Sequence, residues 1–154
     1  MNFEPLRAPW HSVLRLRDGL ELLLNPLQAV AALFARLYVA RVFFNAGLTK
    51  LHDWDTTVAL FTYEYQVPLL APELAAWLGT GGELVFPVLL TLGLGGRFAA
   101  LGLCVVNAVA VISLQDVASA ALQQHITWGV LLAGLAIFGN GRWALDSWLK
   151  APNR

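Results

Sequence analysis

The sequence contains little charge. Asp, Glu, Lys and Arg make up 13% of its 154 residues, against 58% hydrophobic residues, whereas soluble domains usually carry about 25% charged residues. Ten basic and ten acidic side chains cannot coat a water-soluble globule, and so apolar a chain is not intrinsically disordered either. The net charge of zero offers no basic surface to phosphates, which excludes nucleic acid as a partner. What remains is an integral membrane protein of one domain.

The chain also lacks the common motifs of catalytic chemistry. Its one cysteine, Cys104, excludes a Cys-x-x-Cys pair, so the chain alone is not a thiol–disulfide enzyme. It has no Gly-rich phosphate loop and no nucleophile beside a base. No second His or Cys stands at ligand spacing from His125, so the sequence argues against a haem or a bound metal.

Four apolar segments approach or exceed the length of about 20 residues that a membrane-spanning helix needs. They are residues 26–48, 73–94, 98–114 and 117–138. Asn25-Pro26 and Ala71-Pro72 are typical helix starts, and Gly95-Gly96-Arg97 forms a tight turn. Because short connections require antiparallel neighbours, we expect an all-α integral membrane protein. Its fold would be a four-transmembrane-helix antiparallel bundle.

The N-terminal segment predicts an additional helix. No cleavable signal peptide is visible, and residues 12–24 alternate Leu with Arg, Asp and Glu, which is typical of an amphipathic helix at a membrane surface. The predicted organisation is a cytoplasmic amphipathic segment at 1–25, a four-helix membrane domain at 26–146 and a cytoplasmic tail at 147–154.

The basic residues indicate an orientation. On one side of the predicted membrane lie Arg7, Arg15, Arg17, Arg97, Arg142, Lys150 and Arg154. The other side has Lys50 together with Asp53, Asp55, Glu64 and Asp116. By the positive-inside rule, both termini are cytoplasmic. The long outer connection, residues 51–72, is rich in aromatic residues and predicts either an interfacial helix or a lid over a site.

Ionisable residues inside the predicted spans are expensive and therefore indicate function. Arg36 and Glu83 each lie ten residues into their span, so we expect them to pair near the bilayer midplane. Arg41 and Asn45 lie on a second stripe of the first helix. Glu83 can neutralise only one of the two arginines, so the other cation needs another partner. Candidates are Asn107, His125, a backbone carbonyl, water or a bound ligand. The predicted ligand-binding residues are Arg36, Arg41, Asn45, Glu83, Asn107 and His125.

Several short motifs resemble the DoxX family. Arg36-Leu37, Phe43, Ala46-Gly47-Leu48 and Lys50-Leu51 resemble its first-helix signature, and Gly82-Glu83 resembles its second. Residues 139–146 resemble its closing Gly-x-Gly-x-x-Ser-Leu-Asp element, with Ala144 in place of Ser. The similarity runs from about Phe34 to Asp146. It implies that Phe43, Gly47, Lys50, Gly82 and Asp146 are structural motif residues.

The resemblance also implies a setting. It indicates a four-helix protein of the bacterial inner membrane, linked to quinol oxidase or thiosulfate:quinone oxidoreductase complexes and to oxidative or metal stress. Relatives of vitamin K epoxide reductase in the wider clan carry catalytic cysteines that this chain lacks. We therefore expect at most an accessory subunit of a quinone-linked oxidoreductase.

Three functional hypotheses stay open at this stage. The first is a membrane subunit of an oxidoreductase or stress system that binds a quinone or similar lipophilic ligand at a buried Arg/Glu site. The second is a non-enzymatic scaffold or cargo-binding subunit, whose charge pair only sets helix register. The third is a small-ion or metal transporter, lined by Glu83, Asn107 and His125. Expected partners are the lipid bilayer, a soluble or membrane redox protein and a second copy of the chain.

Overall fold

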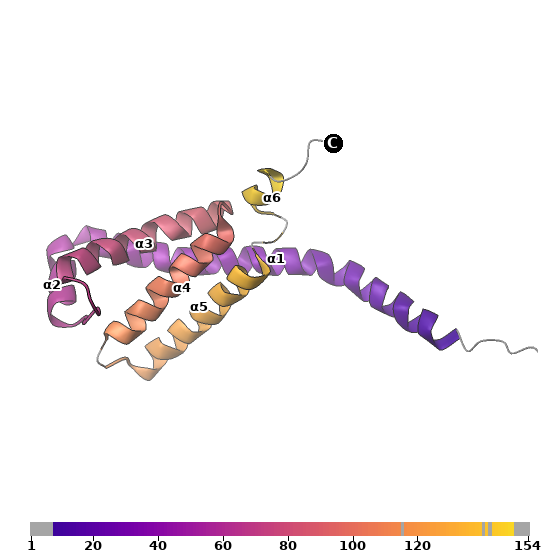
Figure 1. The fold of residues 1–154 in the computed structure, drawn as a ribbon, viewed down its shortest axis with the longest axis horizontal. Coiled ribbons are helices and arrows are strands. Elements are labelled where there is room, and N and C mark those ends of the chain that lie inside the picture. The colour runs from indigo at the N-terminus through magenta and orange to yellow at the C-terminus, as the bar shows by residue number, and fades with distance from the viewer. Residues whose placement is uncertain (1–7, 115, 140, 142, 150–154) are drawn as a thin grey trace, which may run out of the picture.

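The computed structural model describes residues 8–114, 116–139, 141 and 143–149, and this part of the chain is mostly α-helical (Figure 1). Its helices are α1 (Ala8–His52), α2 (Trp54–Tyr63), α3 (Pro72–Leu92), α4 (Gly96–Ser113), α5 (Ser119–Phe138) and α6 (Leu145–Leu149). Four of them, α1, α3, α4 and α5, are long and apolar enough to cross a membrane. The predicted all-α membrane fold with four spanning helices is confirmed.

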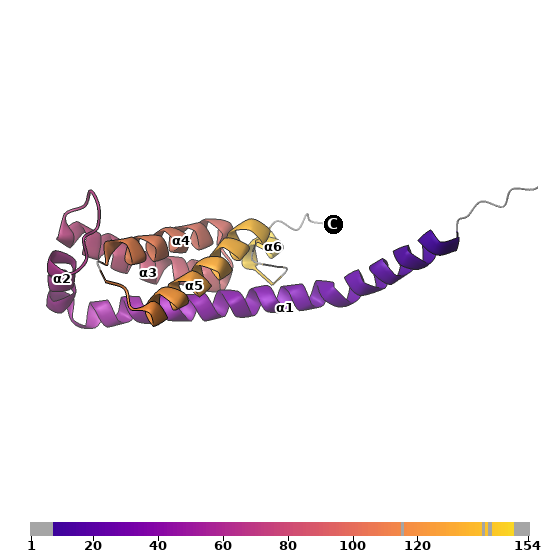
Figure 2. The same ribbon diagram turned by 90° about the horizontal axis from the view of Figure 1, so that it is seen from below.

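Helix α1 is much longer than its predicted span. It begins at Ala8 and runs without interruption to His52, so the helix start expected at Asn25-Pro26 is wrong. Pro26 lies inside α1, where a proline removes one backbone hydrogen bond and bends a helix instead of ending it when good helix formers flank it. The N-terminal part of α1 bends away and projects beyond the bundle as an arm (Figure 2). Side chains 13–28 of this arm are all exposed.

The other helix boundaries follow local backbone chemistry. Pro72 occupies the first turn of α3 after Ala71, as predicted. Gly93 and Gly95 have φ of 73° and 54°, a left-handed conformation that favours glycine, and so they reverse the chain between α3 and α4. A tight turn between these helices is confirmed, but it comprises residues 93–95, because Gly96 and Arg97, which were expected in the turn, already belong to α4.

The four long helices pack as antiparallel neighbours. Helix α1 packs mainly on α3, α4 lies between α3 and α5, and α5 returns to α1. Gly47 lets α1 approach α3 closely, because a Cβ at this position would lie 2.9 Å from the Leu84 side chain. The main core contains Val39, Phe43, Leu90, Ala99, Ala100, Leu103, Leu132 and Leu135.

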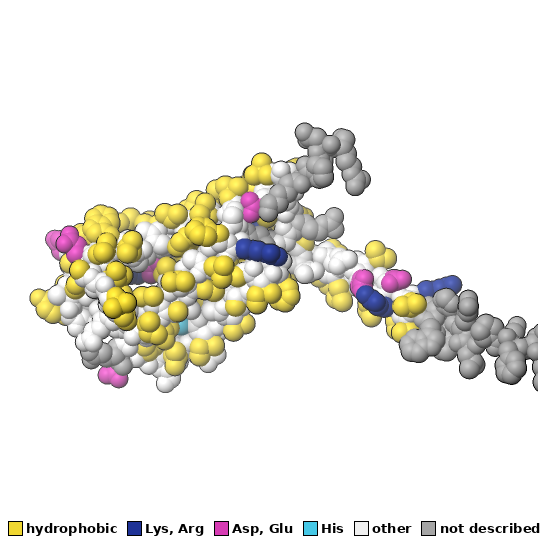
Figure 3. Space-filling view, in the orientation of Figure 1, with side chains coloured by type: hydrophobic (Ala, Val, Ile, Leu, Met, Phe, Trp, Pro, Cys, Tyr) yellow, Lys and Arg dark blue, Asp and Glu magenta, His cyan; other side chains and the backbone are white. Residues whose placement is uncertain are grey.

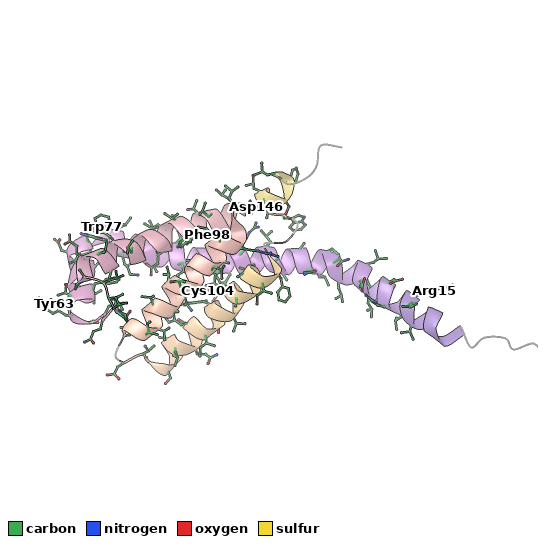
Figure 4. All side chains as sticks on the ribbon, viewed as in Figure 1. Arg15, Tyr63, Trp77, Phe98, Cys104 and Asp146 are labelled. Carbon is green, nitrogen blue, oxygen red and sulfur yellow. The ribbon has the colours of Figure 1, made fainter. Side chains whose placement is uncertain are left out.

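The bundle has two different ends. At the α2 end, α2 packs on the start of α3, with Trp54 and Trp77 rings 4.2 Å apart, and acidic side chains gather there (Figure 3). At the opposite end, which we call the turn end, α6 lies beside the α3–α4 turn (Figure 4). There a carboxylate oxygen of Asp146 accepts a hydrogen bond from the Gly96 amide at 3.2 Å, which caps the start of α4. Apolar side chains cover most of the visible face between the two ends (Figure 3).

Candidate functional site

A cavity of about 480 Å³ lies inside the α2 end of the bundle. All four long helices, α2 and the segment 64–71 contribute to its wall. Most of the wall is apolar, and the polar side chains that line it are those of Lys50, Tyr65, Glu83, Ser113 and His125. Its volume lies within the range of about 300–1,000 Å³ that is typical of small-molecule sites, and such sites combine apolar walls with a few convergent polar groups.

An ion pair between α1 and α3 forms part of the cavity wall. The Lys50 ammonium donates to both carboxylate oxygens of Glu83, at 2.8 Å and 2.6 Å. The side chains of Lys50 and Glu83 are 21% and 9% exposed. An ammonium has three N–H donors, so one donor of Lys50 remains for a ligand after both bonds to Glu83 are made.

A second polar pair joins α4 to α5. The amide of Asn107 donates to the His125 backbone carbonyl at 3.0 Å, and its oxygen lies 2.8 Å from His125 Nδ1. Since an amide oxygen only accepts, Nδ1 carries the proton and Nε2 is the acceptor of the neutral ring. The Trp128 ring packs against both His125, at 4.9 Å, and Phe43, at 5.8 Å between centroids. The predicted residues Asn107 and His125 are thus in direct contact, and His125 lines the cavity.

The segment after α2 contributes to the cavity wall. Gln66 donates its backbone N–H to the Ser113 carbonyl at 2.8 Å, and a bridge pairs Tyr65 with Leu114. Val67 and Leu70 of this segment line the cavity. Burial, and next the nearby negative charge of Glu83, raise the pKa of the Tyr65 phenol, so the hydroxyl stays protonated and can donate. Residues 51–72 thus contain the helix α2 and, after it, a segment that lines the cavity. A lid function for this segment stays a prediction.

The predicted pairing of Arg36 with Glu83 is wrong. Arg36 is buried at the turn end, where its Nη2 donates to the Trp143 carbonyl at 3.1 Å. A Cβ on Gly93 would lie 2.9 Å from Arg36 Nη1, which places Arg36 just beyond the end of α3. The prediction counted residues from the start of each span, but the close approach at Gly47 sets a different register. Lys50 lies almost four turns further along α1 than Arg36, about 21 Å, and it takes the position opposite Glu83.

Arg41 and Asn45 lie on another surface. Both are exposed, and together they line a shallow groove between α1 and α3 that is separate from the cavity. The structure therefore divides the six predicted ligand-binding residues among three places. Glu83 and His125 line the cavity, with Asn107 behind His125 as its hydrogen-bond partner. Arg41 and Asn45 are in the groove, and Arg36 is at the turn end.

The motif residues are mostly packing residues. A Cβ on Gly82 would lie 2.9 Å from the Val106 side chain, so this glycine allows α3 to approach α4. Phe43 is buried in the core, and Gly47 and Asp146 have the packing and capping roles described above. Lys50 is the exception, since it also contributes a charge to the cavity.

No cluster of three or more His, Cys, Asp or Glu side chains that could hold a metal ion occurs in the part of the chain that the structure describes. Cys104 lies in the middle of α4 (Figure 4) and packs against the apolar core. Arg7, Arg142, Lys150 and Arg154, which were part of the predicted charge pattern, lie outside the described residues.

Two cavity residues were missed by sequence reasoning. Tyr65 and Ser113 are far apart in the sequence and carry no motif, and only the folding of 64–71 onto the end of α4 brings them together. Lys50 was assigned to the family motif and to the outer surface. Its position at the end of the Arg36–Phe43–Gly47 stripe was a usable signal, because α1 approaches α3 closely at Gly47.

Comparison with known proteins agrees with this architecture. The sequence profile of the DoxX family matches residues 31–116, which include most of the cavity wall. The chain is also similar to a Haemophilus influenzae protein described only as an uncharacterized protein, with 28% identity over 79% of this chain and 84% of that protein. No solved structure matches this chain. Because the profile match covers more than half of the sequence, the chain belongs to the DoxX family.

Proposed function

We propose that this protein binds a quinone, or a similarly small lipophilic carbonyl compound, in the cavity at its α2 end, as a membrane subunit of an oxidoreductase or oxidative-stress system. The observation that carries the proposal is an apolar cavity with an ion pair and a histidine in its wall. Apolar walls favour a flat, lipid-soluble ring. The polar groups supply the few directional contacts that a carbonyl compound needs.

The polar groups suit a quinone in particular. Lys50 and the Tyr65 hydroxyl are hydrogen-bond donors for a carbonyl oxygen. Glu83 and the Nε2 atom of His125 are acceptors for a quinol hydroxyl, and both can hold a proton. Quinone reduction needs electrons as well as protons, and a partner oxidoreductase is the source or acceptor of the electrons. In this proposal the chain binds the ring and positions the protons.

The test compares two alanine-to-leucine variants on α4. Ala110 lines the cavity, so Ala110→Leu should fill part of it and weaken binding of a short-tailed quinone to the purified protein. Ala108 is exposed on the same helix and is not in the cavity wall, so Ala108→Leu is the matched control. Mass spectrometry of compounds that co-extract in mild detergent would identify the native ligand. No quinone in the extract, together with equal weak binding by both variants, would contradict the proposal.

A scaffold function is the second candidate, and the arm of α1 favours it. Residues 13–28 are exposed and project beyond the bundle, which suits contact with a membrane surface or a partner protein. A variant with Leu16, Leu20 and Leu23 changed to Ser tests this role. Loss of cellular activity with quinone binding intact would favour the scaffold function, and unchanged activity would exclude it.

We further propose that the protein lies in the bacterial inner membrane with both termini in the cytoplasm. Arg15 and Arg17 on the arm, and Arg97 at the turn end, support this orientation, as do Asp53 and Glu64 at the α2 end. The cavity would then face the outer leaflet. Reporter fusions after Leu114 and after Leu149 test the orientation, since they should report opposite sides of the membrane.

A further inference from the structure

Arg41 is a cation on the lipid-facing surface of the bundle. It lies on α1 and is exposed, in a helix segment that spans the membrane. It makes no hydrogen bond or ion pair with the residues that the structure describes. Glu83 on the neighbouring helix is already bound to Lys50. Because an uncompensated charge inside a bilayer is unfavourable, this guanidinium indicates a partner from outside the chain.

A groove of about 440 Å³ surrounds Arg41 between α1 and α3. Its polar lining side chains are Arg41, Asn45 and Thr91. The remainder of the wall is apolar and consists of Leu37, Ala40, Phe44, Pro87, Val88 and Leu92. Leu37, Val88 and Leu92 are each more than 40% exposed, so the groove opens onto the surface that faces the acyl chains.

The groove lies near the end of the membrane span. Thr91 and Leu92 belong to the last turn of α3, and the register set by Gly47 puts Arg41 within about two turns of that end. Two turns of helix measure about 11 Å. The long Arg side chain extends along this distance toward the helix end, to the level at which lipid phosphates lie. A guanidinium at this depth meets phosphate oxygens, which it can bind with two parallel hydrogen bonds.

We propose that this groove is a binding site for an anionic phospholipid of the leaflet at the turn end. Arg41 binds the phosphate, and Thr91 in the last turn of α3 donates to a headgroup oxygen. Asn45, one turn of α1 closer to the membrane centre, donates to an ester carbonyl, and an acyl chain continues in that direction along Val88 and Phe44. The charge complements the lipid, and the exposed apolar wall complements its chain. This site is separate from the cavity and does not depend on the proposed quinone function.

The test is native mass spectrometry of the full chain in micelles that contain phosphatidylglycerol or phosphatidylcholine. The wild-type protein should retain phosphatidylglycerol in preference to phosphatidylcholine. Arg41→Gln should weaken retention about fivefold, the effect expected for one basic residue near a lipid surface. Arg97→Gln removes an exposed cation at the same end of the bundle but outside the groove, so it should leave retention unchanged.

Other outcomes identify other occupants and overturn the proposal. Equal losses in the two variants would mean general attraction to anionic surfaces. Displacement of the lipid by excess inorganic phosphate would mean a free-anion site, and a change of oligomeric state in Arg41→Gln would mean that a second copy covers the groove. Val88→Trp, which blocks the groove sterically, should also reduce retention. Ala110→Leu, in the cavity, should leave it unchanged and so separates this proposal from the quinone function.

Discussion

Lys50 and Glu83 form an ion pair across the α1–α3 interface, with both carboxylate oxygens within 2.8 Å of the ammonium nitrogen. The pair lies beside a helix contact, since Gly47 lies one turn before Lys50 and packs against the Cβ of Glu83. The pair therefore depends on the close approach of the two helices. It joins the packing of the bundle to the chemistry of the cavity.

Removing one member of this pair should destabilise the protein. Glu83→Gln leaves the Lys50 charge without its partner in an apolar wall, and we expect a loss of about 3 kcal/mol of unfolding free energy. The double variant Lys50→Met with Glu83→Met should recover most of it, because no buried charge remains. SDS titration of the protein in detergent measures the unfolding free energies of the single and the double variant. Equal stability of the wild type and Glu83→Gln would contradict a buried, mutually dependent pair.

The Gly47 contact gives a second prediction. A methyl group at this position would lie 2.9 Å from Leu84 and 3.2 Å from the Cβ of Glu83, so Gly47→Ala should cost about 1–3 kcal/mol. Gly81 on α3 has no atom within 4 Å of the same added group. Gly81→Ala should be neutral or more stable by about 0.5–1 kcal/mol. Thermal unfolding of the two variants side by side checks the register, which would be wrong if Gly47→Ala were as stable as Gly81→Ala.

A buried hydroxyl on α3 gives a third prediction. Thr80 is 2% exposed, and its Oγ1 has no hydrogen-bond partner among the described residues. Thr80→Val keeps the shape and removes the unsatisfied group, so it should stabilise the protein by about 1 kcal/mol. Thr57 is also buried, but its hydroxyl donates to the Lys50 carbonyl at 2.9 Å. Thr57→Val should therefore destabilise the protein. Destabilisation by both variants would contradict the prediction, because it would mean that the Thr80 hydroxyl does have a partner.

The stability of α2 should depend on pH, because Asp53 caps the start of this helix. Asp53 accepts hydrogen bonds from the Thr56 hydroxyl and amide, at 2.7 Å and 3.0 Å, and these bonds lower its pKa from the ordinary 3.8. A lowered folded-state pKa contributes stability above 3.8, which is lost as the pH falls through the folded-state value. The hydrogen-exchange protection factors of residues 54–63, which are corrected for the slower intrinsic exchange in acid, should thus fall as the pH drops below 3.8. In Asp53→Asn, which keeps an acceptor without a titrating group, this acid effect should be absent, and an identical response in both proteins would contradict it.

The fold could be predicted largely from the sequence, and the site only in part. Hydrophobic length is a strong signal, so α3, α4 and α5 lie close to their predicted spans. Pro26 misled the prediction of α1, because a proline in the first turn and a proline inside a bent helix look alike in one sequence. The depth of Arg36 was misjudged because register depends on the contact between Gly47 and Leu84, which no count from helix ends contains.

The polar residues illustrate the same limit. Asn107 and His125 could be named because polar side chains are rare in apolar helices, and they do pair. Tyr65 could not be named, because its place in the cavity depends on a backbone hydrogen bond between Gln66 and the end of α4. Side chains brought in by a connection leave no periodic pattern, whereas side chains on long helices do.

The most direct test of the quinone proposal is photo-crosslinking with a photoreactive quinone analogue, followed by mapping of the labelled peptides. The proposal predicts adducts on the cavity wall, at Tyr65, Val105 or Val106, and their loss when an excess of unmodified quinone competes. Label that is confined to the exposed arm or the outer face of α5, or that quinone does not displace, would contradict a quinone site in this cavity.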